Sequence, residues 1–170
     1  LQKGHRKSVD LDLFGECILE EDVLTETVSR MGRITWLNKL KNIKSLLING
    51  IKVDFVNYSY PWLSLPVTEG SIRLANTKDI APMKLAAITG RGAKKDFTDI
   101  YFLLKDFTFN EMIELYEKKY PDGSAFLVLK SLIYFDDAEG DEMPQMLIPV
   151  SWKTVKQTIV DCHRQYTTEH

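Results

Sequence analysis

Three aspartates lie in two short runs of the chain that alternate apolar and polar residues as β-strands do. Asp10 and Asp12 are two apart in the run 8–14, and Asp54 lies within the run 51–56. Residues two apart on a strand project from the same side, with Cα atoms about 7 Å apart. Carboxylates at this spacing suit Mg²⁺, which takes oxygen ligands and keeps several waters for substrate phosphates. The pattern therefore predicts a magnesium site that handles nucleotide phosphates.

The Asp-x-Asp pair by itself is also compatible with a purely structural role. An isolated pair is more often the solvated side of an amphipathic strand than a catalytic motif. Asp54 argues against that role, because aspartate is disfavoured inside strands and here lies in the middle of a run. A haloacid-dehalogenase-type phosphatase has a continuous apolar strand before its Asp-x-Asp and Gly-Thr after it. Here the polar, basic segment 5–8 precedes the pair and Leu13-Phe14-Gly15 follows it, so that class is excluded.

Lys84 is the next residue whose position suggests chemistry. It lies in the predicted helix 80–88, four residues from both Ile80 and Ile88 and within an apolar stripe. A lysine on such a face either extends its ammonium to solvent along the apolar surface or meets an anion. A nucleotide phosphate in a neighbouring cleft would be such an anion, and the pattern alone leaves both possibilities open.

Asp96 and Asp99 lie three residues apart in the first turns of the next predicted helix, and therefore on one side of it. The helix dipole favours acidic residues there by ~0.3–1 kcal/mol, which is enough to account for either aspartate alone. Together with nearby cations they are also candidates for the polar wall of a nucleotide cleft. The candidate nucleotide-binding residues are Arg6 and Ser8 in the basic loop, Lys84, Arg91 and Lys95.

The elements that would position these groups are strands in the first half of the chain and helices in the second. Asn49-Gly50 between two apolar runs predicts a β-hairpin, because both central residues of such a turn need positive φ. A helix is predicted over 24–31 and a further strand over 71–75. From Thr77 onward the chain is predicted to be mostly helical, and the acidic segment 136–141 to be a solvated loop. The predicted helix caps are Thr77, Thr108, Ser124 and Ser151.

Composition sets the broad class. The 170 residues form one domain, or one domain with a helical extension, and their net charge of −2 gives no global attraction to nucleic acid or membrane. Cys17 and Cys162 lack metal-ligand spacing, so a reducing cytoplasm is expected. There is no signal-peptide pattern and no apolar run near the ~20 residues of a membrane span, so no membrane association is expected.

The motifs in this order resemble those of a known family. Residues 4–14, GHRKSVDLDLF, are similar to the Asp-x-Asp segment of the AbiEii-type nucleotidyltransferases, the toxin subunits of bacterial abortive-infection and toxin–antitoxin systems. The segments 84–88 and 95–101, with Arg91 between them, are similar to that family's later lysine and arginine-aspartate motifs. The resemblance covers roughly residues 1–105.

The resemblance implies an α+β fold. A DNA-polymerase-β-like nucleotidyltransferase core, a mixed sheet with helices, would occupy residues 1–105, and a helical C-terminal region would follow over 106–170. Family members use a nucleoside triphosphate and Mg²⁺ to modify a cellular acceptor, with tRNA 3′ ends known for some. A cognate antitoxin protein is the further partner that the resemblance implies.

The resemblance also implies roles for individual residues. Asp10 and Asp12 would be metal ligands, and Lys84 would contact nucleotide phosphates. Asp96 or Asp99 would be the later catalytic acid, with the choice between them left open. Asp54 matches the third carboxylate of the wider superfamily more loosely.

One departure from the family concerns the start of the chain. The family has a Gly-Gly/Ser-Thr/Ser-Ala-Leu segment ahead of the Asp-x-Asp strand, whose backbone amides hold the triphosphate, whereas this chain starts at Leu1, after that point. We expect either that upstream residues are missing, so that the natural protein is an enzyme and this fragment binds nucleotide poorly, or that the chain is a degenerate homologue. A non-catalytic interaction module is therefore the alternative function, and an Asp-x-Asp sugar transferase a weaker third.

Overall fold

The computed structural model describes residues 3–16 and 20–169. These residues form two compact units, which are described separately. The sheet unit is Ser8–Tyr60, and the helical unit consists of the residues up to Lys7 together with those from Pro61 onward. The combination of a mixed sheet with helices confirms the predicted α+β fold class.

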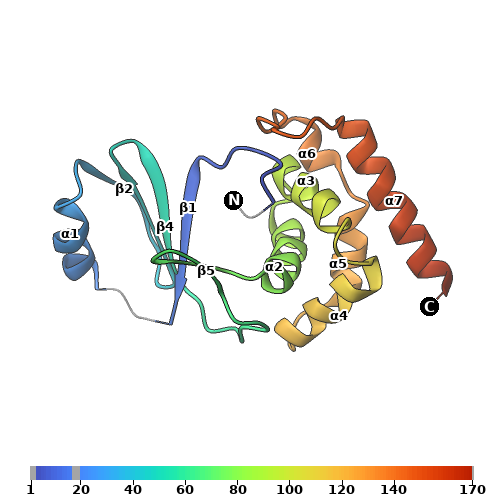
Figure 1. The fold of residues 1–170 in the computed structure, drawn as a ribbon, viewed down its shortest axis with the longest axis horizontal. Helices are drawn as coiled ribbons and strands as arrows, with labels where there is room; N and C mark the ends of the chain where they lie inside the picture. The colour runs from blue at the N-terminus through green and yellow to red at the C-terminus, as the bar shows by residue number, and fades with distance from the viewer. Residues whose placement is uncertain (1–2, 17–19, 170) are drawn as a thin grey trace. The chain divides into compact units, whose positions relative to one another are not determined.

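The sheet unit is a four-stranded mixed sheet with one helix (Figure 1). The strand order is β1-β4-β3-β2, in which β1 is parallel to β4 and the other pairs are antiparallel. Cys17 lies outside the described residues. The elements are β1 (Asp10–Gly15), α1 (Glu21–Ser29), β2 (Ile34–Lys39), β3 (Ile43–Ile48) and β4 (Ile51–Asn57).

The predicted hairpin is confirmed as the connection between β3 and β4. Ile48 pairs with Ile51, and the two residues between them, Asn49 and Gly50, have φ of 52° and 85°. Both values are in the left-handed region that a two-residue hairpin turn of this kind requires. This turn sets the register of β4, and the register in turn decides on which face of the sheet Asp54 projects.

Helix α1 covers one face of the sheet. Its buried residues Leu24 and Val28 pack against Leu46 of β3, and Ile34, Trp36, Ile48 and Phe55 surround this small core. Leu11 and Leu13 of β1 project on the same face but remain 46% and 49% exposed. Because successive strand residues alternate in direction, Asp10, Asp12 and Asp54 project from the opposite face. The three aspartates therefore emerge together, as the alternation predicts.

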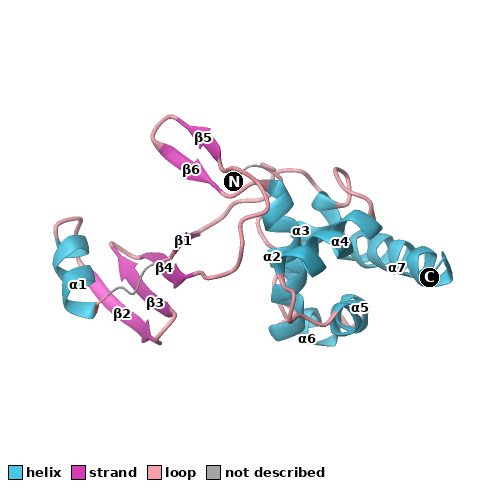
Figure 2. Cartoon of the chain, turned by 90° about the horizontal axis from the view of Figure 1, so that it is seen from below, coloured by secondary structure: helices cyan, strands magenta, loops and turns pink. Residues whose placement is uncertain are grey.

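The helical unit contains six helices among its described residues and one two-stranded hairpin, which is seen clearly in Figure 2. The predicted strand over 71–75 is confirmed as β6, which pairs with β5. The elements are β5 (Val67–Glu69), β6 (Ile72–Leu74), α2 (Thr77–Gly90), α3 (Lys94–Leu103), α4 (Phe109–Lys119), α5 (Ala125–Leu132), α6 (Asp136–Glu139) and α7 (Trp152–Glu169).

One hydrophobic core holds these helices together. It contains buried residues from α2, α3, α4, α5 and α7, among them Leu85, Phe97, Met112, Val128 and Ile159. The predicted boundary between residues 105 and 106 falls in the turn between α3 and α4, both of which contribute to this core. The functional division of the chain at that point stays a prediction.

The helix caps are largely as predicted. Thr108 and Glu111 form a reciprocal capping box at α4, Ser124 accepts a hydrogen bond from Leu127 N at α5, and Thr154 N donates to Ser151 Oγ at α7. The predicted cap at Thr77 is wrong, because the side chain of Asn76 accepts the bond from Lys78 N and Thr77 is already the first residue of α2. None of the helices among the described residues is long and apolar enough to cross a membrane.

The prediction that the acidic segment 136–141 is a solvated loop is confirmed for its exposure, since every residue of it except Ala138 is exposed, but wrong for its conformation, because residues 136–139 are helical. The segment contains α6, whose Ala138 is fully buried, and Asp141 Oδ2 accepts a hydrogen bond from Lys94 N at the start of α3. The Lys94 ammonium donates to the backbone oxygens of Glu139 and Asp141. The segment is therefore fastened to α3 by a buried lysine, a long-range contact that no local pattern of residues predicts.

Candidate functional site

The candidate residues of the sheet unit form two adjacent cross-strand pairs on one face. In the parallel register of β1 and β4, Asp10 lies beside Lys52 and Asp12 lies beside Asp54. Neighbouring strands are about 4.8 Å apart and alternate residues on one strand about 7 Å apart, so the four side chains occupy a small rectangle. We call these four residues the acidic face. Asp12 is exposed, and the side chain of Asp54 is 15% exposed.

A lysine ammonium lies among the three carboxylates of the acidic face. Lys52 Nζ donates to Asp54 Oδ2 at 2.6 Å. This hydrogen bond raises the pKa of Lys52 above its usual value against the opposing effect of partial burial, and the charges of Asp54, Asp10 and Asp12 raise it further. All three aspartates are thus close enough to act on one ammonium, which is the clearest sign that the face concentrates negative charge.

The donor chemistry of the acidic face suits a hard cation, because carboxylate oxygens are the ligands that Mg²⁺ prefers. The Lys52 ammonium is itself a cation placed among those oxygens. Within residues 3–16 and 20–169, however, no three His, Cys, Asp or Glu side chains are arranged so that they could hold a metal ion. The acidic face therefore has the donor type that a hard cation takes, but its side chains are not arranged as a metal centre.

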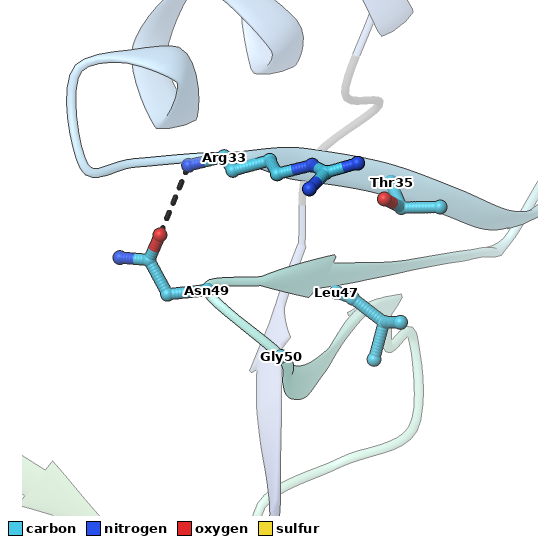
Figure 3. A pocket seen from close by; sticks show the side chains of 5 residues that line it. All are labelled: Arg33, Thr35, Leu47, Asn49 and Gly50. Carbon is cyan, nitrogen blue, oxygen red and sulfur yellow. Dashed lines mark hydrogen bonds between the residues drawn. The ribbon is translucent and has the colours of Figure 1, made fainter.

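A pocket that sequence reasoning missed opens at the β3–β4 turn (Figure 3). Its volume is about 420 Å³, and it is lined by Arg33, Thr35, Leu47, Asn49 and Gly50. In the sheet register, Leu47 of β3 pairs with Thr35 on one side and with Lys52 on the other. The two lining residues Thr35 and Leu47 therefore project on the same side of the sheet as the acidic face. Arg33 N donates to Asn49 Oδ1 at 3.0 Å, which joins the rim of the pocket to the turn.

The candidate residues of the helical unit form an ion-pair network centred on two buried aspartates of α3. The guanidinium of Arg6 binds Asp99 with two hydrogen bonds, from Nε to Oδ1 at 2.6 Å and from Nη2 to Oδ2 at 2.8 Å. Lys84 Nζ lies 2.7 Å from Asp99 Oδ2 and donates to Asp96 Oδ1 at 2.9 Å. Arg91 Nε donates to the other oxygen of Asp96 at 3.2 Å. We call these five residues the α3 network.

The pKa values of the network follow from burial and paired charge. Burial alone raises the pKa of Asp99, but hydrogen bonds from Arg6 and His5 and the charge of Lys84 outweigh it and hold the pKa well below its usual range. Burial likewise lowers the pKa of Lys84, and the carboxylates of Asp99 and Asp96 more than compensate, so this pKa is raised. Both groups are therefore charged at neutral pH.

Lys84 accordingly meets anions within its own chain. The two alternatives predicted for a lysine within an apolar stripe are solvent and a phosphate, whereas the ammonium of Lys84 lies against oxygens of Asp96 and Asp99. Asp96 is fully buried and Asp99 is 5% exposed. The Lys84 side chain is 24% exposed and that of Arg91 60% exposed, so of these four residues Arg91 presents the most surface to solvent.

His5 is a member of this site that sequence reasoning missed. Its Nε2 lies 2.8 Å from Asp99 Oδ1, and its ring stacks on Phe102 with centroids 4.4 Å apart. The His5 carbonyl oxygen accepts hydrogen bonds from Leu147 N and Ile148 N. The segment before β1 is thereby held between α3 and residues 145–148, and a lone histidine next to a glycine offers no sequence signal of this role.

The two remaining candidates are Ser8 and Lys95. Ser8 Oγ donates to the backbone oxygen of Asp10 at 3.2 Å, which supports the start of β1. Lys95 is half-buried in the first turn of α3. The roles of both in nucleotide binding stay predictions.

Comparison with known proteins places the chain beside an uncharacterized relative and two solved folds. No family model matches the sequence. The uncharacterized protein aq_aa25 of Aquifex aeolicus is 35% identical over 163 residues, which cover 92% of this chain and 78% of that protein. This chain belongs to the aq_aa25 family. Identity at this level over nearly the whole chain extends the relationship to both compact units.

Two crystal structures from Helicobacter pylori are similar in fold to this chain. JHP933 matches with a TM-score of 0.53 and 17% identity, covering 96% of this chain and 77% of its own. The second, named as that of a "putative nucleotidyltransferase", matches with a TM-score of 0.50 and 16% identity, covering 97% and 82%. At such identities the likeness concerns the fold alone.

Proposed function

We propose that the protein is an AbiEii-type nucleotidyltransferase that moves a nucleotide from a nucleoside triphosphate to a cellular acceptor. The observation that carries the proposal is the acidic face, where Asp10, Asp12 and Asp54 project together from two paired strands. Two further points support it: the fold is nucleotidyltransferase-like, and the sequence motifs follow the order of that family.

Asp10, Asp12 and Asp54 would hold Mg²⁺ in this function. When bound, the ion would offset the charge of a triphosphate and of the oxygen that attacks it. The protein's own contribution at this face is to keep three carboxylates on one side of a sheet whose other side is packed on α1. Strand pairing sets their spacing before any ligand arrives, and a prearranged site loses less free energy on binding.

Within the helical unit, the α3 network is the candidate contact for a phosphate in this proposal. Arg91 is the member best able to reach a ligand, because its side chain is 60% exposed and its contact with Asp96 is made through Nε. Lys84 would contact a phosphate through what remains exposed of its ammonium. Asp96 and Asp99 are too buried to touch a substrate directly, and we propose that both position Lys84 and the two arginines.

The biological setting that we propose is a toxin of a toxin–antitoxin or abortive-infection system, acting in the cytoplasm. tRNA is the acceptor to test first, and a cognate antitoxin would be the protein partner. Expression of the chain in a bacterial host, with and without the neighbouring gene, measures this directly. Growth arrest that the neighbouring gene relieves, and that Asp10→Asn with Asp12→Asn abolishes, is the expected result.

The activity is tested by incubating the protein with each labelled nucleoside triphosphate, Mg²⁺ and total tRNA. We expect label transfer that is lost in the Asp10→Asn/Asp12→Asn variant. Asp22→Asn, an exposed acidic change in the first turn of α1, is the matched control and should transfer label as the unchanged protein does. Transfer that survives the double change would refute the proposed role of the acidic face, and its absence from the unchanged protein would favour a non-catalytic interaction module.

A further inference from the structure

The pocket at the β3–β4 turn has no part in the function proposed above. Its volume is about 420 Å³, and its lining residues are Arg33, Thr35, Leu47, Asn49 and Gly50 (Figure 3). Not one of these five residues is acidic, and Arg33 brings a positive charge. The lining of the pocket therefore suits an anion.

Hydrogen bonds of Asn49 hold the rim of this pocket in place. Asn49 Oδ1 accepts from Arg33 N at 3.0 Å, and Asn49 Nδ2 donates to the carbonyl oxygen of Met31 at 3.1 Å. Asn49 N donates to the carbonyl oxygen of Arg33 at 2.9 Å. The turn is thereby fastened to the residues just before β2, and a prearranged site loses less free energy when its ligand binds.

Two polar side chains of the pocket are available to a ligand. Figure 3 shows the Arg33 side chain extended along β2 towards Thr35, so the guanidinium and the hydroxyl lie on the same wall. Within residues 3–16 and 20–169, neither group forms a side-chain hydrogen bond or an ion pair. Arg6 and Arg91, by contrast, are both bound to aspartates.

The chemistry of these two groups matches a phosphate. A guanidinium presents its N–H donors as a planar fork that fits phosphate oxygens, and arginine and threonine side chains commonly contact the phosphates of nucleic acids. Leu47 is half-buried and adds an apolar wall, against which a sugar or a base can pack. The pocket thus offers a charged wall for the phosphate and an apolar one for what the phosphate is attached to.

The pocket and the acidic face lie on the same side of the sheet. One row of the register runs from Asp10 to Lys52, then to Leu47 and Thr35. With neighbouring strands about 4.8 Å apart, Thr35 lies roughly 14 Å from Asp10. A nucleoside triphosphate or a strand of nucleic acid is long enough to reach from one to the other.

We propose that this pocket binds a phosphate group through the Arg33 guanidinium and the Thr35 hydroxyl, with the attached sugar or base against Leu47. The choice of phosphate over other anions rests on the proposed function. Both the incoming nucleoside triphosphate and a nucleic-acid acceptor carry this group, and the experiment distinguishes the two.

The test titrates the ¹⁵N-labelled full chain, without metal, with oligouridylate, UTP and uridine. Nuclear magnetic resonance follows the backbone amide of Gly50 and the Nε–H of Arg33. We expect both signals to shift with a phosphate-bearing ligand and to stay in place with uridine. Shifts with UTP alone assign the phosphate to the incoming nucleotide, and shifts with oligouridylate assign it to an acceptor strand.

Arg33→Met removes the guanidinium and keeps the aliphatic stem. We expect at least about tenfold weaker binding of the phosphate-bearing ligand, because a charge-assisted pair of hydrogen bonds is lost. Arg33→Lys should recover only part of the affinity, since it restores the charge without the planar fork. For oligouridylate, the slope of log affinity against log salt concentration should fall by about one in Arg33→Met.

Arg30→Met is the matched control. The Arg30 side chain is 76% exposed, pairs with Glu26 at 3.2 Å and lies outside the pocket lining. This variant should bind each ligand as the unchanged protein does. If Arg33→Met misfolds by circular dichroism, Arg33→Gln replaces it with the same expectation.

The proposal would be overturned if neither phosphate-bearing ligand shifted the pocket signals, or if Arg30→Met and Arg33→Met weakened binding equally. Its failure is distinguishable from failure of the proposed function, because the titration contains no metal and follows no transfer. Label transfer by a protein whose pocket ignores phosphate would keep the function and refute the pocket. Phosphate binding by a protein that transfers nothing would do the reverse.

Discussion

Lys84→Met separates a structural role of Lys84 from one confined to phosphate binding. The change keeps the aliphatic stem and removes the ammonium that lies 2.9 Å from Asp96 Oδ1 and 2.7 Å from Asp99 Oδ2. Asp96 is fully buried and Asp99 almost so, and neither can recover the lost partner from solvent. The variant should therefore fold with lower stability even when no nucleotide is present.

The size of the loss follows from the contacts that remain. Removing one partner of a buried ion pair destabilises a protein by about 3–5 kcal/mol when the other charge is left uncompensated. Here Asp96 keeps Arg91 and Asp99 keeps Arg6, so the lower end applies. We expect the free energy of unfolding to fall by about 3 kcal/mol, a large fraction of the 5–15 kcal/mol typical of a folded domain.

Urea unfolding followed by circular dichroism at 222 nm measures this change in the helical unit. Lys118→Met is the control, because the Lys118 side chain is 67% exposed and its ion pair with Glu114 is 3.9 Å long. An exposed pair of this kind contributes about 0–0.5 kcal/mol. A loss below about 1 kcal/mol for Lys84→Met would refute the structural role argued from the α3 network and would favour a lysine reserved for ligand.

Three other predictions concern the rest of the fold. Lys119→Met should lower the free energy of unfolding by about 3–5 kcal/mol in the same urea assay, because it leaves the fully buried Asp79 without the ammonium now 2.7 Å away; a loss like that of a surface lysine would contradict this. Gly32→Ala should destabilise the sheet unit, since its Cβ would collide with the side-chain amide of Asn49 at a φ of 148°, and an unchanged melting temperature would count against that geometry. The stability that Asp99 contributes should be complete above its unfolded pKa of about 4 and be lost as pH falls below it towards the depressed folded pKa, so acid titration of Asp99→Asn should lack that part of the pH dependence and an identical acid profile would disprove it.

Local patterns predicted the parts of the fold that depend on neighbouring residues. Asn49-Gly50 specified a hairpin because only certain residues tolerate positive φ at both turn positions. Thr108 specified the start of α4 because a capping side chain and the backbone N–H groups that it satisfies lie within one turn of each other. The alternation on β1 and β4 likewise placed three aspartates on one face, since strand side chains alternate regardless of what packs on them.

The sequence by itself therefore determined the β3–β4 hairpin, most of the predicted helix caps and the grouping of Asp10, Asp12 and Asp54. Only the tertiary structure decided what the basic residues face. Arg6 meets Asp99 across 93 positions of the chain, and the fully buried Lys119 meets Asp79 across 40. Such pairings depend on which elements pack together and on the low dielectric of a buried site, and no spacing along the chain encodes either one.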